Sequence, residues 1–112
     1  MQKVFSAWLK YLLISSNKFL IITVNGIPTL ARFPDFYGKI LNLDTGHGFR
    51  KESDQPDLND ENYGSAIVTS KFISDILNET NSHVLYSVTP GKWFGGQDEY
   101  VFASKDLYNQ FL

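Results

Sequence analysis

The 112-residue sequence contains no cysteine, only two histidines and no long uninterrupted run of apolar residues. Without cysteine, the chain has no disulfides, no thiol nucleophile and no thiolate ligands for a metal. No segment approaches the roughly 18 uncharged apolar residues of a membrane span. A signal peptide is not predicted, because Lys10 interrupts the N-terminal apolar stretch and no small-residue cleavage site follows it. We therefore expect a cytoplasmic protein that contacts no membrane and carries no cofactor.

An excess of charge of one sign is also missing. Twelve acidic and ten basic residues give a formal net charge of −2, which argues against direct binding of nucleic acid. Hydrophobic residues make up 43% of the chain and aromatic residues 15%, a composition typical of a globular protein. This length predicts one domain over residues 1–112, with enough buried surface for one core.

The clearest local signal is Asn25-Gly26, which separates two apolar runs. Both residues tolerate positive φ, so the pair favours the two-residue turn of a β-hairpin. The first run, residues 19–24, is apolar on both faces, which predicts a buried central strand. The second run, residues 27–33, is predicted to be an edge strand because Pro28 donates no backbone hydrogen bond. Such an edge offers a site for dimerisation or strand addition, although Pro28 opposes it.

Around this hairpin the pattern is less regular. Residues 2–15 are predicted to form an amphipathic helix, with six apolar residues at helical spacing: Val4, Phe5, Trp8, Leu9, Leu12 and Leu13. Residues 39–44 alternate like a short strand. Residues 45–64 show no periodicity and are rich in Gly, Asn and Asp, which predicts a long acidic surface loop.

The second half contains one pattern twice: an apolar run is followed by Ser, then by Lys, and then by apolar residues at helical spacing. Ser70 and Ser104 are therefore predicted to cap helices over residues 71–79 and 105–111. An alternative for the first unit is one helix that begins near Ser65.

Between these units, residues 83–88 and 98–103 are predicted to form a second hairpin, joined by the glycine-rich residues 89–97. The resulting order predicts an α+β fold in a single domain. Its sheet is mainly antiparallel with two hairpins, and its helices lie at the N-terminus, in the middle and at the C-terminus.

Histidine supplies the main candidate for catalysis. His47 lies close to Arg50 and Lys51, and an imidazole with two cations suits a metal-independent ribonuclease as acid, base and phosphate clamp. Nothing in the sequence places His83 beside it. The alternative is an ordinary surface histidine, so we predict no catalytic residue and keep a ribonuclease using His47 as an alternative function.

Residues 52–61 carry a cluster of acidic side chains with no base: Glu52, Asp54, Asp57, Asp60 and Glu61. A calcium loop, and hence a metal site, is not predicted, because Asn62 and Val68 stand where that motif requires glycine and glutamate. A solvated loop is one interpretation. The other is a negative patch that steers a basic protein partner.

Trp93 and Phe94 lie in the glycine-rich connection, where polar residues are usual. Exposed aromatic side chains are candidate hot spots of a protein interface. In the alternative interpretation, one of them folds back onto the core and fixes the loop.

Residues 67–77, Ile-Val-Thr-Ser-Lys-Phe-Ile-Ser-Asp-Ile-Leu, resemble segments of immunity proteins from bacterial polymorphic toxin systems. The small size, mild acidity and α+β layout are also similar to that group. The resemblance implies an inhibitor that neutralises a toxin enzyme, such as a nuclease, by direct contact. It carries no binding residues across.

The expected partner is therefore a basic toxin or nuclease domain. The five acidic residues would steer it, and Trp93 and Phe94 would anchor it. A phage-encoded anti-defence inhibitor would be physically the same kind of binder, so it stays open as an alternative.

Overall fold

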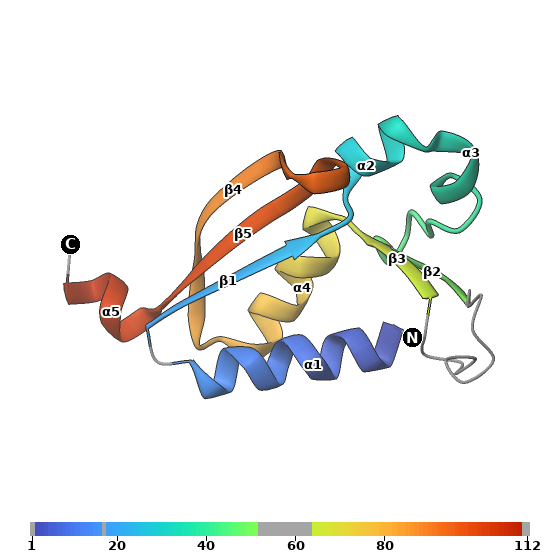
Figure 1. The fold of residues 1–112 in the computed structure, drawn as a ribbon. Coiled ribbons are helices and arrows are strands. Elements are labelled where there is room, and N and C mark those ends of the chain that lie inside the picture. Colours follow the sequence, from blue (N-terminus) through green and yellow to red (C-terminus); the bar gives the residue numbers. More distant parts are fainter. Residues whose placement is uncertain (1, 17, 52–63, 111–112) are drawn as a thin grey trace, which may run out of the picture.

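The computed structural model describes residues 2–16, 18–51 and 64–110 (Figure 1). The helices of these ranges are α1 (Gln2–Ser15), α2 (Ile27–Arg32), α3 (Pro34–Tyr37), α4 (Ser70–Thr80) and α5 (Lys105–Gln110). The strands are β1 (Phe19–Val24), β2 (His47–Lys51), β3 (Gly64–Val68), β4 (His83–Trp93) and β5 (Gln97–Ser104). They form an antiparallel sheet in the order β1-β5-β4 and a two-stranded antiparallel sheet, β2-β3. The expected α+β class is confirmed.

The core lies between the three-stranded sheet and the two longer helices. Leu9 and Leu13 of α1 and Phe72, Ile73 and Ile76 of α4 are buried there. The sheet contributes alternate residues of β1 and β5 to this core: Ile22, Val24, Tyr100 and Phe102. Full burial of one such side chain contributes about 1.5–3 kcal/mol, so this layer is the main source of stability.

The predicted hairpin at Asn25-Gly26 is wrong, because residues 27–32 form the helix α2. Gly26 has an extended backbone, with φ −126° and ψ −154°, and not the positive φ of the hairpin turn. Pro28 sits in the first turn of α2, where its fixed φ and missing N–H cost nothing. The turn is replaced by tertiary contacts, since the Asn25 side chain donates to the carbonyl oxygen of Ala66 at 2.9 Å.

The prediction that residues 19–24 form a buried central strand is also wrong. β1 pairs only with β5 in the described part of the chain, and its residues alternate between exposed and at least half-buried. The central strand is β5, which is buried at six of its eight positions. β1 is therefore apolar on both faces although only one of these faces is buried.

Residues 39–44 do not form the expected strand. They are mostly in turns, and Asn42 makes a single bridge to His47. The expected loop over 45–64 begins with ordered structure instead, because residues 47–51 form β2, which pairs with β3 from His47↔Val68 to Lys51↔Gly64. The rest of that loop, residues 52–63, lies outside the described residues.

The strand-to-helix units of the second half are largely confirmed. The helix near 71–79 is α4, with the expected Phe72, Ile73 and Ile76 buried. Ser104 acts as the predicted cap, because its hydroxyl oxygen accepts the N–H of Leu107 at 3.2 Å. Ser70 does not cap its helix; its hydroxyl pairs with that of Tyr100 at 2.9 Å.

The second hairpin is confirmed and is longer than expected. β4 runs on to Trp93, with irregularities between Leu85 and Ser87 and between Thr89 and Trp93, and a short 3₁₀ turn over Phe94–Gly96 leads into β5.

The amphipathic helix over 2–15 is confirmed as α1, but Val4 and Trp8 of its expected inner face are almost half exposed. Within the described ranges, no helix combines the length and the apolar character needed to cross a bilayer.

Candidate protein-binding surface

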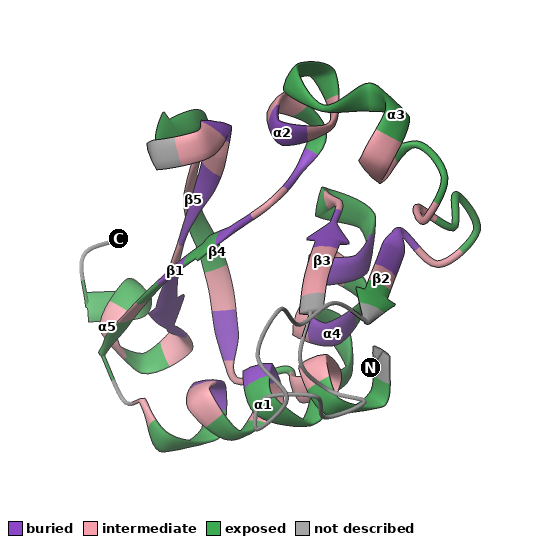
Figure 2. Ribbon diagram, turned by 45° about the vertical axis from the view of Figure 1, so that its right-hand side comes forward, coloured by how far each residue is buried: buried purple, intermediate pink, exposed green. Residues whose placement is uncertain are grey.

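The sheet has one face that the long helices do not cover. α1 and α4 pack against the face of Ile22 and Tyr100, so the alternate residues Phe19 and Ile21 point to the other side. Phe19 and Ile21 are 50% and 59% exposed, and Tyr86 of β4 is 61% exposed. Exposed positions alternate with more buried ones along β1, whereas most of β5 is buried (Figure 2).

Two aromatic rings of this face touch across the sheet. Phe19 and Tyr86 meet edge to face, with ring centroids 5.7 Å apart. They come from opposite edges of the three-stranded sheet, and Val84 and Phe19 both pair with Ala103 on the central strand. The contact thus spans β5 and makes one continuous apolar surface from the two edge strands.

Trp93 extends the same face toward the end of β4. Its indole Nε1 donates to Glu99 Oε2 at 2.9 Å, and Lys92 Nζ lies 3.2 Å from Glu99 Oε1. Lys92 also lies over the Trp93 ring, 5.7 Å from its centroid. Glu99 pairs with Thr23, the next residue after Ile21 on this face. We call Phe19, Ile21, Tyr86 and Trp93 the aromatic sheet face.

Glu99 holds Trp93 in place as a carboxylate. The hydrogen bond from Trp93 lowers the pKa of Glu99, and the hydrogen bond from Lys92 lowers it further. An indole fixed at its nitrogen loses little further side-chain entropy on binding, because it is already ordered. Trp93 remains 48% exposed, so its ring is both fixed and accessible.

The hairpin end that carries Trp93 is fixed to the rest of the molecule. Thr29 of α2 donates to the carbonyl oxygen of Gly96 at 3.2 Å, and Gln97 donates to Asn25 Oδ1 at 3.2 Å. Buried Asp98 accepts the N–H of Gly91 at 2.9 Å. Trp93 is therefore not on a protruding glycine-rich loop, as the sequence suggested, but at the anchored end of a strand.

The other predicted binding residues are Phe94 and the five acidic side chains. Phe94 begins the 3₁₀ turn directly after Trp93. All five predicted acidic residues lie outside the described residues: Glu52, Asp54, Asp57, Asp60 and Glu61.

His47 does not lie in a flexible loop. It is the first residue of β2, is 5% exposed, and packs between Phe72, at 5.0 Å, and Phe5, at 6.1 Å. Burial lowers its pKa, and its Nε2 has no hydrogen-bond partner within the described residues. Arg50, three residues further along the strand, is exposed and lies over the Phe36 ring at 5.2 Å. His47 and Arg50, two of the three side chains expected in a ribonuclease site, thus lie in different surroundings.

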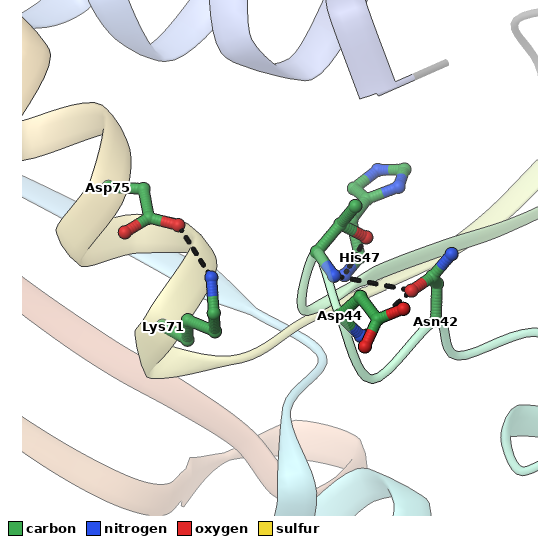
Figure 3. Close-up of polar contacts among 6 residues, drawn as sticks. Asn42, Asp44, His47, Lys71 and Asp75 are labelled. Carbon is green, nitrogen blue, oxygen red and sulfur yellow. Dashed lines mark hydrogen bonds and ion pairs between the residues drawn. The ribbon is translucent and has the colours of Figure 1, made fainter.

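The polar groups next to His47 are occupied with one another (Figure 3). Asn42 Oδ1 accepts the backbone N–H of Asp44 at 2.8 Å, and Lys71 pairs with Asp75 at 2.9 Å across one turn of α4. Asp44, Lys71 and Asp75 line a cavity of about 280 Å³ between the turn and the helix. Charges of both signs alternate there, so the cavity has no clear ligand class.

Phe19, Ile21, Tyr86 and Glu99 were not predicted as site residues. The sequence of β1 is apolar on both faces, a pattern that favours burial on both sides and gives no sign that Phe19 and Ile21 are exposed. A hydrogen bond between Trp93 and Glu99, six residues apart across a hairpin, leaves no signal in the sequence. No protein-family model, curated protein or solved structure matches this chain.

Proposed function

We propose that this protein is a binding module that engages another protein through the aromatic sheet face. The observation that carries the proposal is Trp93, an indole half exposed and held at its nitrogen by Glu99. Tryptophan and tyrosine that are fixed but accessible are the side chains most enriched in interface hot spots. Tyr86, Phe19 and Ile21 add exposed apolar area further along the same face, and an exposed apolar patch is typical of an interaction site.

The specific activity that we propose is inhibition of a basic enzyme, as in an immunity protein that neutralises a toxin nuclease in the cytoplasm. The support is the resemblance of residues 67–77 and the acidic cluster in residues 52–61. Complementary charge would speed the encounter, and the aromatic sheet face would supply the lasting contact. An anti-defence inhibitor would use the same surface against a different target.

The test begins with capture of partners from host lysate by the tagged chain, followed by reconstitution with the purified partner. Trp93→Ala is expected to weaken that binding by about thirtyfold, the loss typical of a hot-spot residue. Tyr11→Ala is the matched control, because Tyr11 is an exposed aromatic residue on α1, away from this face. Wild-type affinity in a folded Trp93→Ala variant would contradict the proposal.

Inhibition is measured separately from binding. If the partner is a nuclease, one equivalent of the wild-type chain should abolish its activity, and Trp93→Ala should shift the inhibition curve by the factor found for affinity. Binding without inhibition would support the proposal that the protein is a binding module and would contradict the proposal that it is an immunity protein.

A further inference from the structure

The outer edge of β1 has backbone groups that point away from the sheet. Ser104 donates its N–H to the carbonyl oxygen of Lys18 at 2.8 Å, so even-numbered residues of this strand bond to β5. In an antiparallel ladder the alternate residues then point their N–H and C=O outward. These are Phe19, Ile21 and Thr23, and no strand of the described ranges pairs with them.

The two edges of the sheet differ in how they are protected. β4 has two irregularities in its register, and it also contains Pro90 and Lys92. Irregular register, proline and a charged side chain each oppose pairing with a further strand. β1 reads Phe-Leu-Ile-Ile-Thr-Val, with no charge, no proline and no irregularity in its register. One edge is thus blocked, and the other is suited to pairing.

An apolar flank of α1 runs along this open edge. Lys10 pairs with Glu79 at 2.5 Å, so the flank of Lys10 faces α4. At 3.6 residues per turn, Trp8 and Leu12 lie on the opposite flank, away from α4. α1 itself packs in the core with Ile22 and Val24 of β1. Trp8 is 44% exposed and Leu12 is half-buried, so this flank extends the apolar layer beyond β1.

A cavity lies at the C-terminal end of the same edge. Asn25 ties β1 to β3 there, since its carbonyl oxygen accepts the N–H of Val68 at 2.9 Å. The cavity holds about 170 Å³ between Thr23, Phe5 and Ala66, and no charged side chain of the described residues lines it. Thr23, Asn25 and Gln97 bring uncharged polar atoms to its lining, so it suits one uncharged side chain of moderate size.

We propose that this groove accepts an extended segment of a partner protein as a fourth strand beside β1. Backbone hydrogen bonds to the N–H of Phe19 and to both groups of Ile21 and Thr23 would supply affinity. The carbonyl oxygen of Phe19 already accepts the hydroxyl of Ser16 at 3.1 Å. Alternate side chains of the segment would lie on Trp8 and Leu12, and one would enter the cavity, which gives selectivity for an uncharged, apolar sequence.

A single strand fits this groove better than a second copy of the chain. Pairing of two β1 strands would place them about 4.8 Å apart. Each copy would bring its own α1 under its β1, and packed helices need about 8–10 Å between their axes. The groove shares Phe19 and Ile21 with the aromatic sheet face, but it uses their backbone groups and α1, and not Trp93. It therefore does not depend on the proposed function.

The test uses a phage-displayed library of random linear peptides, selected on the full chain. Enriched peptides should be uncharged with apolar residues at alternate positions. Their binding should slow hydrogen exchange at the amides of Phe19, Ile21 and Thr23 by at least about tenfold, as expected for newly bonded N–H groups.

Two variants locate the site. Ile21→Pro removes an outward N–H without removing a bond to β5, and should weaken peptide binding by about tenfold or more. Ile21→Thr keeps that N–H and should bind within about threefold of wild type. Trp8→Lys places a charge on the groove flank and should weaken binding similarly, whereas Ile14→Lys, on an exposed position away from the groove, should not.

Three results would overturn the proposal. One is a failure to enrich any peptide above a selection on Ile21→Pro. Another is slowed exchange at other amides, with Trp8→Lys binding normally. The third is a concentration-dependent dimer that protects the same amides, which would make the occupant a second copy. Trp93→Ala should leave peptide affinity unchanged, so failure of this groove and failure of the aromatic sheet face are distinguishable.

Discussion

Gly26 has no side chain because the carboxylate of Asp98 occupies the space that a Cβ would need. A Cβ built there would lie 2.0 Å from Asp98 Oδ2 and 2.9 Å from its Cγ. Asp98 cannot retreat freely, since it is buried and accepts the N–H of Gly91. A glycine that looked like a turn residue is thus a site of close approach between the start of α2 and the central strand.

Gly26→Ala is therefore expected to destabilise the fold by about 1–3 kcal/mol, the usual cost of a forced contact in a packed region. Urea unfolding measures the change. The double variant Gly26→Ala, Asp98→Ala tests the cause, because removal of the carboxylate should make the added methyl group much less costly. A double variant in which the two losses simply add would contradict the proposed clash.

His47 makes a prediction about pH. Burial lowers its pKa in the folded state below the usual 6.5, so the unfolded state binds a proton more readily. Stability is then complete above pH of about 6.5 and falls as the pH decreases below it, by at most about 1.4 kcal/mol per pH unit for one proton. His83 is also buried with a lowered pKa and adds to the same slope.

His47→Leu should flatten this acid dependence, because it removes the proton that the unfolded state binds. Unfolding free energies at pH 7 and pH 5 measure the difference for wild type, His47→Leu and His83→Leu. Equal losses between the two pH values in wild type and His47→Leu would show that His47 binds its proton equally in the folded and the unfolded state.

Among the elements, those fixed by local sequence were predictable and those fixed by distant contacts were not. The helices α1 and α4 and the hairpin β4-β5 follow from periodicity and turn residues that lie within each segment. α2 does not, because Asn25-Gly26-Ile27-Pro28 fits both a hairpin and a helix start. The choice depends on Ala66 and Asp98, far away in the sequence.

The candidate site follows the same division. Trp93 was predicted as an anchor because it is an aromatic residue in a glycine-rich segment. Its hydrogen bond to Glu99 depends on the register of the hairpin and could not be predicted. The exposure of Phe19 and Ile21 depends on which face of the sheet the helices cover, and the sequence of β1 alone does not determine that.

At the scale of elements, α2 holds the end of the hairpin through one hydroxyl. Thr29 is buried and donates to the carbonyl oxygens of Gly95 and Gly96. Thr29→Val keeps the shape and removes the donor, so it should cost about 1 kcal/mol or more. It should also speed hydrogen exchange in the hairpin end.

Thr29→Ser is the matched control, because it retains the hydroxyl. If urea unfolding gives Thr29→Val the stability of wild type, α2 is held by its apolar contacts alone.

For the whole molecule, the distribution of charge should govern the rate of association. With a net charge of only −2, long-range steering of a basic partner must come from local clusters, and residues 52–61 hold the densest one. Reversal of Asp54, Asp57 and Asp60 to Lys should slow association by about tenfold or more at low salt. Surface plasmon resonance at two salt concentrations measures the rate.

The dissociation rate should change little in that triple variant, because the cluster would act before contact and not within it. Unchanged association in both salts would remove residues 52–61 from the mechanism and leave the aromatic sheet face as the sole basis of binding.

The position of β5 has a consequence for synthesis of the protein. β5 lies between β1 and β4 in the sheet, yet it follows both of them along the chain. While the ribosome is still making the residues before 97, β1 has been released without the strand that pairs with it. An uncharged apolar strand that is unpaired during synthesis is a binding site for chaperones and a starting point for aggregation. This state ends when residues 97–104 leave the ribosome and complete the sheet.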